Sequence, residues 1–206
     1  MRAPGPWGDN RRVRVGLLGG SFNPAHDGHR HVAELALTLL GLDQVWALVS
    51  PQNPLKSADG MAPQALRLAS AQAVLGRHPR LAATDLESAL GTRFTADTLI
   101  RLRLRFPHVR FVWLMGADNL AQMQRWSRWK RIFTVVPIAI LARSPYSWVA
   151  LAAPAARAMG RYRQKSARAR GLAALTPPAW VFLHTRLHPA SATEIRARMA
   201  HWERRS

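Results

Sequence analysis

The segment from Gly19 to Arg30, GGSFNPAHDGHR, contains the residues of this chain that are best suited to bind phosphate. It follows an apolar run, turns through two glycines and enters a predicted helix at His29. Glycines let backbone N–H groups come close to a ligand, and a helix N-terminus favours negative charge. His26 and His29 stand three residues apart, so a helical turn would bring both imidazoles to one side. The pair could clamp a phosphate or form half of a metal site. The plainer alternative is a strand–turn–helix with two surface histidines.

A second candidate phosphate site is the segment SATEIR, from Ser191 to Arg196. Ser191 and Glu194 have the spacing of a capping box, which in its plainest interpretation only starts a helix. Thr193 and Arg196 would lie on the first turn of that helix, where a hydroxyl, a guanidinium and backbone N–H groups could hold phosphates. Both roles are compatible, because the cap orients the turn that would bind.

Strand-like and helix-like patterns alternate along the chain and must position these residues. Short apolar runs predict buried strands at Val13–Leu18, Val45–Val49, Leu81–Thr84, Val109–Met115, Val135–Leu141 and Trp180–His184. Helices are predicted at His29–Leu40 with Gly41 as its cap, Pro63–Leu75, Thr95–Arg105, around Leu120–Ile132, and Ser191–Trp202. The Ala/Arg-rich stretch 152–178 has helical potential but no clear core stripe. This alternation predicts an α/β fold with a mostly parallel sheet flanked by helices, and ligands at the carboxyl ends of its strands.

Composition narrows the functional classes. With 206 residues, 48% of them hydrophobic, the chain fits one domain that buries its own core. The absence of cysteine excludes disulfides, thiolate metal sites and a cysteine nucleophile. The formal charge of +19 comes from 27 arginines and 3 lysines spread along the chain. We attribute most of it to a GC-rich codon supply, although an anionic substrate would benefit from the field. Residues 1–12 are expected to form a flexible tail without a signal peptide, and no stretch approaches the roughly 18 apolar residues that span a bilayer. A soluble, cytoplasmic protein is expected.

The first segment resembles the G-G-x-F-x-P-x-H-x-G-H signature of the nucleotidyltransferase superfamily. Every fixed position matches: Gly19, Gly20, Phe22, Pro24, His26, Gly28 and His29. Within that superfamily the chain is similar to bacterial nicotinate-nucleotide adenylyltransferases, because FTADTL (94–99), GADNL (116–120), Trp126 and SATEIR (191–196) follow in the same order. The resemblance implies one Rossmann-like nucleotidyltransferase domain over residues 13–206.

The resemblance also implies the reaction. A phosphate oxygen of nicotinate mononucleotide would attack the α-phosphorus of ATP in line, giving deamido-NAD and pyrophosphate. The attacking group is already an anion, so the enzyme needs no nucleophile of its own and works by alignment and charge neutralisation. Mg²⁺ is expected to be carried by the ATP phosphates, with no metal site built by the protein. The imidazoles are expected to act as imidazolium donors, since nearby phosphate favours that form.

Site residues are carried over from the resemblance position by position. The expected catalytic residues are His26, His29 and Arg196. Those expected to bind ATP are Gly19, Gly20, Ser21, Phe22, Lys56, Asp118, Arg143, Ser191 and Thr193. Those expected to bind nicotinate mononucleotide are Thr95, Thr98 and Trp126, whereas Trp113 and Trp129 are expected in the core. Asp118 and Thr95 could alternatively be N-caps.

Two positions of the chain depart from the family pattern. Asn23 replaces a common Asp, and Leu55 replaces a family histidine, so only Lys56 of that element is carried over.

Two alternative functions fit the residues less well. A phosphopantetheine adenylyltransferase would commonly have Thr in place of the first histidine. An inactive, basic RNA-binding protein with this fold would not need both histidines and Arg196, and basic-aromatic interleaving is missing. The expected partners are therefore ATP and nicotinate mononucleotide, with no membrane and no specific nucleic acid. Whether the chain forms a homo-oligomer stays open.

Overall fold

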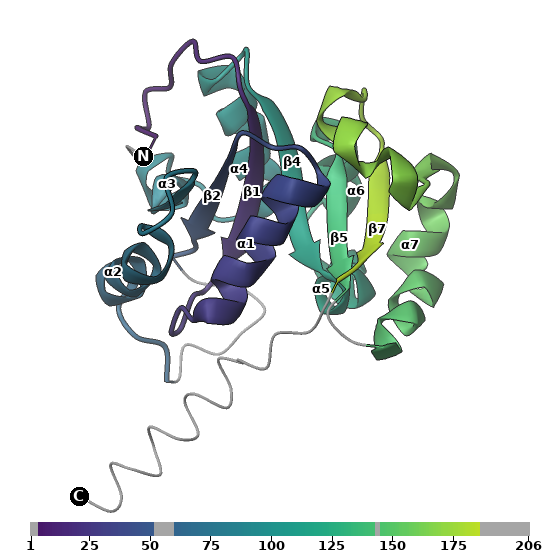
Figure 1. The fold of residues 1–206 in the computed structure, drawn as a ribbon, viewed down its shortest axis with the longest axis horizontal. Helices are drawn as coiled ribbons and strands as arrows, with labels where there is room; N and C mark the ends of the chain where they lie inside the picture. The colour runs from purple at the N-terminus through teal and green to yellow at the C-terminus, as the bar shows by residue number, and fades with distance from the viewer. Residues whose placement is uncertain (1–3, 52–59, 143–144, 186–206) are drawn as a thin grey trace, which may run out of the picture.

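Seven parallel strands form one sheet in the order β3-β2-β1-β4-β5-β7-β6. Figure 1 labels the inner strands, with β1 and β4 side by side. The structure, a computed structural model, describes residues 4–51, 60–142 and 145–185. The strands are β1 (Arg14–Gly20), β2 (Gln44–Val49), β3 (Leu81–Thr84), β4 (Arg110–Gly116), β5 (Ile138–Ala142), β6 (Arg163–Gln164) and β7 (Trp180–His184). The predicted α/β fold with a parallel sheet is confirmed.

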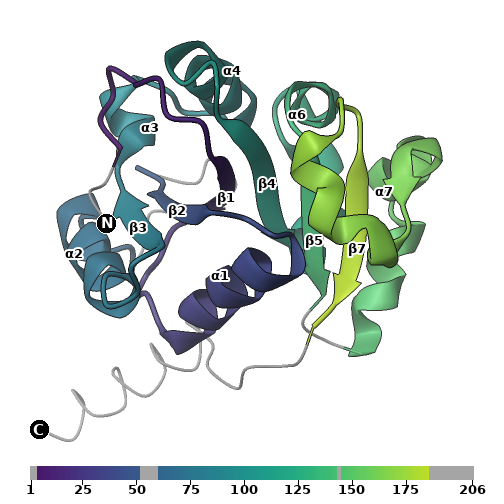
Figure 2. The ribbon, with the colours of Figure 1, turned by 45° about the horizontal axis from the view of Figure 1, so that its top comes forward.

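Helices cover both faces of the sheet (Figures 1 and 2). The sheet therefore separates the core into two apolar layers. The α-helices are α1 (Asp27–Leu39), α2 (Gln64–Leu75), α3 (Leu86–Ala89), α4 (Thr95–Arg105), α5 (Ala117–Gln122), α6 (Trp129–Val135) and α7 (Pro154–Ala158). Four 3₁₀ helices are described: η1 (Met123–Arg125), η2 (Pro145–Ala152), η3 (Gly160–Tyr162) and η4 (Ser166–Ala174). Helices α1 and α2 pack with η4 on one face, and α3 to α7 contribute to the layer on the other. None of the helices in these ranges is long and apolar enough to cross a membrane.

The predicted strands lie where the apolar runs lie because a parallel sheet with helices on both faces buries most residues of its inner strands. All five residues of β5 are buried, as are five of the seven in β4. Two predicted strands differ in their bounds. The strand expected from Val135 begins at Ile138, because α6 runs to Val135. The first strand was expected to end before the glycines. Gly19 and Gly20 instead form its last two positions and pair with Leu48 and Val49 of β2. The helix predicted at Ser191–Trp202 lies outside the described residues.

The Ala/Arg-rich stretch closes one edge of the sheet on both faces. Its small side chains are buried on each side: Ala155 and Ala156 of α7 in one layer, and Ala169 and Ala173 of η4 in the other. Between them, β6 pairs with β7 as the last strand. A stripe of alanines carries little hydrophobic contrast, which is why periodicity did not reveal these elements.

Residues 4–12 contain no strand or helix, but they contact the folded chain. Arg11 forms an ion pair with Asp9 (2.5 Å), and its guanidinium lies 5.5 Å from the Trp46 ring centroid. A Cβ on Gly8, where φ is +81°, would lie 1.8 Å from the Arg105 carbonyl oxygen. The boundary of a flexible tail at residue 12 stays a prediction.

The strand order reverses direction at β1, which lies between β2 and β4. Ligands of open parallel sheets bind outside the carboxyl ends of the strands at such a switch point. The carboxyl end of β1 is Gly20 and that of β4 is Gly116. The histidine-bearing turn and the GADNL segment therefore meet at the edge where a nucleotide is expected.

Gly19 gives the first prediction, because Trp113 occupies the space that a side chain there would need. An added Cβ would lie 2.3 Å from Trp113 Cη2, and Trp113 is itself 3% exposed in the core. We expect Gly19→Ala to lower the free energy of unfolding by about 1–3 kcal/mol, the usual scale of overpacking. The matched control is Gly171→Ala, since a Cβ there meets nothing within 4 Å. Urea unfolding of both variants measures the difference, and equal stabilities would contradict the account.

Candidate nucleotide-binding site

The start of α1 is held by two histidines that cap it reciprocally. His26 is the N-cap, and its Nδ1 accepts a hydrogen bond from the Gly28 N–H (3.1 Å). In return, His29 Nδ1 accepts from the His26 N–H (3.2 Å). The two rings lie 3.9 Å apart between centroids, so both imidazoles sit together over the turn. The prediction that His26 and His29 face one side is confirmed.

This cap decides which ring nitrogen can bear a proton. A nitrogen that accepts a backbone N–H cannot carry a hydrogen of its own, so Nδ1 of each ring is the bare nitrogen. Nε2 is then the protonated nitrogen, and each imidazole is a neutral Nε2–H donor. The imidazolium form that is expected beside a phosphate would carry a second proton on Nδ1 and would give up this cap, and it stays a prediction.

Phe22 fixes the shape of the turn that leads into the cap. Its backbone is left-handed, with φ at +49°, which is uncommon for a bulky residue. The side chain is 1% exposed, and its ring lies 4.7 Å from that of His29. Burial of the phenyl ring thus stabilises a strained backbone and places His29 beside it.

Asn23 connects this turn to the start of α2. Its Nδ2 donates to the Gly60 carbonyl (2.9 Å), and its Oδ1 accepts from the Ala62 N–H (3.2 Å). A carboxylate could make only the second of these bonds, because it has no hydrogen to donate. The departure from the family's Asp therefore adds a link between two loops.

Arg67 of α2 belongs to no recognised motif, yet it contacts the turn. It is 2% exposed, and Nη1 donates to the Ser21 carbonyl at 2.6 Å. The signal was present, because Arg67 precedes the buried Ala71 and Leu75 at four-residue spacing. A charged residue on the buried stripe of a helix indicates a specific polar partner.

Asp118 follows β4 at the switch point, with an exposed side chain in the first turn of α5. The alternative N-cap role is wrong, since the cap is Gly116 and no side chain bonds to it. Likewise, α4 begins at Thr95 with Phe94 as its N-cap. Neither Asp118 nor Thr95 is therefore an N-cap, and each lies where a loop meets a helix.

The structure places Thr98 in the interior, which differs from the place expected for it. It was expected beside the mononucleotide, but it is fully buried, and its hydroxyl lies 2.9 Å from Thr92 Oγ1 and 3.2 Å from Glu87 Oε1. These contacts fasten α4 to α3. Thr98 supports the loop that precedes Thr95 rather than facing a ligand.

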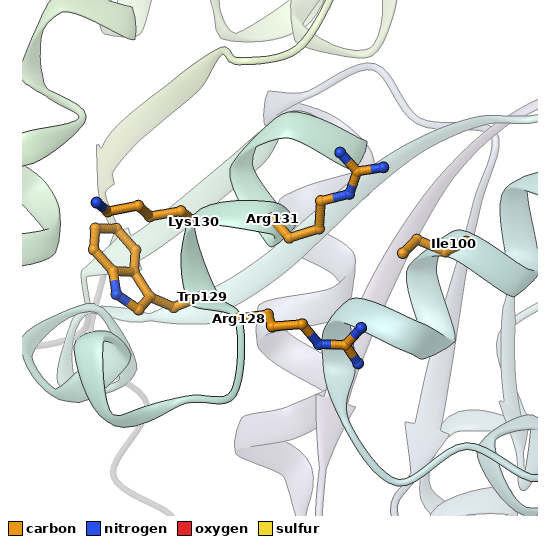
Figure 3. Close-up of a pocket in the computed structure, with 5 residues that line it drawn as sticks. All are labelled: Ile100, Arg128, Trp129, Lys130 and Arg131. Atoms are coloured by element: carbon orange, nitrogen blue, oxygen red, sulfur yellow. The ribbon is translucent and has the colours of Figure 1, made fainter.

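Trp126 is half-buried against the core, on the segment that leads into α6. Two residues later Arg128, with φ at +50°, forms an ion pair with Asp97 of α4. The pair brings the Trp126 segment next to the helix that Thr95 begins. Figure 3 shows the surface hollow beside this contact, lined by Arg128, Arg131 and Ile100 together with Trp129 and Lys130. Trp129 is partly buried against the core and Trp113 is fully within it, as expected.

Five predicted site residues lie outside the described residues: Lys56, Arg143, Ser191, Thr193 and Arg196. The residues that the structure does bring together at the carboxyl edge are the turn from Gly19 to Phe22, the two histidines and Asp118.

Glu87 gives a prediction about pH. Burial raises its pKa to about 7, although the hydrogen bond from Thr98 acts in the opposite direction. The folded chain therefore keeps a proton that the unfolded chain releases above its ordinary pKa of 4.5. This contribution to stability is complete below pH 4.5 and is lost as the pH rises through about 7.

Glu87→Gln removes the titration while keeping the size and the hydrogen-bonding capacity. Relative to this variant, the wild type should lose stability between pH 4.5 and about 7, with a slope of at most about 1.4 kcal/mol per pH unit. Chemical unfolding at a series of pH values measures the difference. Parallel curves for the two proteins would contradict a buried, protonated Glu87.

Comparison with known proteins agrees with the geometry. The profile of the Cytidylyltransferase-like family matches residues 17–198. A "Probable nicotinate-nucleotide adenylyltransferase" of Gluconacetobacter diazotrophicus is 54% identical over 96% of this chain and 91% of its own length. One of the same name from Parvibaculum lavamentivorans is 53% identical over 90% of this chain and 92% of its own.

Among solved structures, the Plasmodium falciparum nicotinic acid mononucleotide adenylyltransferase complexed with NaAD has the same fold. Its TM-score is 0.63 at 15% identity, over 90% of this chain and 83% of that one. The sequence identities, the family profile and the paired histidines at the switch point lead to one assignment. This chain belongs to the nicotinate-nucleotide adenylyltransferases of the Cytidylyltransferase-like family.

Proposed function

We propose that this protein transfers AMP from ATP to nicotinate mononucleotide, giving deamido-NAD and pyrophosphate in NAD biosynthesis. The observation that carries the proposal is the pair of imidazoles that cap the start of α1, side by side at the carboxyl end of β1. Two fixed donors beside a helix N-terminus suit a polyphosphate better than a neutral ligand. Relatives that share more than half of the sequence bear the name of this enzyme.

The chemistry requires alignment more than reactive groups. The mononucleotide phosphate is the nucleophile, so the protein has to hold it in line with the α-phosphorus and the leaving pyrophosphate. We assign the backbone of Gly19 to Phe22 and the two imidazoles to the ATP phosphates. As charge moves onto the leaving group, prepositioned Nε2–H donors stabilise it without reorganising.

ATP enters as its magnesium complex in this proposal. Mg²⁺ binds triphosphate oxygens and keeps most of its water, so it needs few protein ligands. Asp118 then lies near the nucleotide at the edge of β4. Lys56, Arg143, Ser191, Thr193 and Arg196 complete the ATP site by resemblance to the family. The proposed location of the enzyme is the cytoplasm, where its substrates occur.

The mononucleotide lies on the Thr95 and Trp126 side. The Asp97–Arg128 ion pair links the two segments that carry these residues, which supports a shared site. The indole of Trp126 can stack on a flat, cationic pyridinium ring. Selectivity for the carboxylate must come from N–H donors of the protein near the ring substituent. A carboxylate accepts from such donors, whereas the NH₂ group of an amide would face them without a hydrogen bond.

The histidine assignment is tested by His26→Asn. Asparagine is a good N-cap, so the variant keeps the helix start but loses the Nε2–H donor. We expect stability close to wild type and turnover lower by roughly 10²–10³-fold, the scale for losing one prepositioned donor. His26→Ala is the control, since it should also lose ~1 kcal/mol of stability with the cap. Undiminished turnover of folded His26→Asn would reduce His26 to a cap.

Substrate stacking is tested by Trp126→Ala. The indole does not sense the ring substituent, so kcat/KM should fall by an amount equivalent to roughly 1–3 kcal/mol for both nicotinate and nicotinamide mononucleotides. The wild-type preference for nicotinate should persist in the variant. Trp129→Ala is the matched control, because its ring packs against Phe133 and its loss should affect stability. A wild type that prefers the amide would overturn the nicotinate assignment, and unchanged kinetics of Trp126→Ala would place that indole outside the site.

A further inference from the structure

Arg67 is a buried cation that contacts backbone carbonyls of three loop segments. Its Nη1 donates to Ser21 (2.6 Å) and Ser50 (2.8 Å), Nη2 to Pro51 (2.8 Å), and Nε to Ala62 (2.8 Å). These carbonyls belong to the turn after β1, the end of β2 and the approach to α2. One guanidinium thus joins the neighbouring loops at the carboxyl edge of the sheet.

The charge of Arg67 is not neutralised by a carboxylate in the part of the chain that the structure describes. The ion pairs there involve Arg11, Arg14, Arg30 and Arg128 only. Burial lowers the pKa of Arg67, but an arginine keeps its proton at neutral pH. Removing a cation from water without a counter-ion is expensive, and carbonyl dipoles compensate only in part. A substrate phosphate at the adjoining turn would add a negative charge near this cation.

The bond to Ser21 also fixes the direction of the next N–H group. The peptide between Ser21 and Phe22 is trans, so its N–H points opposite to its C=O. With the Ser21 carbonyl directed at Arg67, the Phe22 N–H is directed away from α2. The left-handed φ of Phe22 makes this orientation strained, and a strong, charge-assisted hydrogen bond stabilises it.

We propose that Arg67 is a positioning residue for adenylyl transfer: it holds the Ser21–Phe22 peptide with its N–H toward the ATP phosphates and places a buried positive charge behind them. The role is indirect, since Arg67 acts through the turn and the protein backbone contacts the substrate. The proposal rests on the proposed function for its kinetic test, and on the hydrogen bonds above for its geometry.

The test compares Arg67→Met, Arg67→Lys and the control Arg103→Met. Arg103 also donates to a backbone carbonyl, that of Val135 (3.0 Å), but between α4 and α6. Steady-state kcat and KM are measured separately for ATP and nicotinate mononucleotide, together with the melting temperature. Arg67→Met should lower kcat/KM for ATP by about 10²-fold, the scale of misplacing a binding group by an ångström. The KM for nicotinate mononucleotide should stay unchanged.

Arg67→Lys should recover part of the loss, because an ammonium keeps the charge but cannot bridge four carbonyls in a fixed fork. Should Arg67→Met fail to fold, the lysine variant decides alone. A lower kcat/KM for ATP together with a normal melting temperature would then support the positioning role of Arg67. Equal losses for both substrates, or losses no larger than those of Arg103→Met, would overturn the proposal.

Failure of the proposed function is distinguishable. It would appear in the wild type, as an absence of pyrophosphate release with ATP and nicotinate mononucleotide. Calorimetric binding of magnesium pyrophosphate to wild type and Arg67→Lys then still tests the geometry. Weaker binding by the variant supports the role of Arg67, and equal binding refutes it.

Discussion

The hydrogen bonds that His26 and His29 exchange with the backbone at the start of α1 are the constraint on which the site depends. They satisfy N–H groups that a helix start otherwise leaves unpaired, so they are structural in the first place. Because each bond uses Nδ1, the same interaction fixes Nε2 as the donor of each ring. The stability of the helix start and the choice of donor nitrogen therefore depend on the same two side chains. Neither histidine can change its tautomer without losing one of these hydrogen bonds.

The rest of the edge reinforces this turn from three sides. The Trp113 ring packs against Gly19 and leaves no room for a larger residue at that position. Phe22 anchors its bend through a buried ring, and Arg67 ties its carbonyl to the loops beside it. Each of these residues has an apolar or backbone contact that holds the turn, so we expect the turn to keep one shape before any ligand binds. Preorganisation of this kind is what a reaction without a protein nucleophile requires.

The sequence predicted the fold and the close approach of the two histidines well, and for physical reasons. Long apolar runs such as VWALV in β2 have few alternatives to a buried strand, and the spacing of the two histidines matches one helical turn. It failed where a side chain's role depends on distant partners. Thr98 matched a family position, yet its hydroxyl contacts Glu87 and Thr92. Arg67 carries no motif, because its four acceptors are carbonyls that any residue type provides.

We infer that the two histidines donate hydrogen bonds to phosphate and do not attack it. The stereochemical course at the α-phosphorus distinguishes the two roles. The substrate is ATP made chiral there by a phosphorothioate, and the configuration of the dinucleotide product is determined. One in-line displacement by the mononucleotide predicts inversion. Retention would require two displacements through a covalent adenylyl-enzyme, and it would contradict the account.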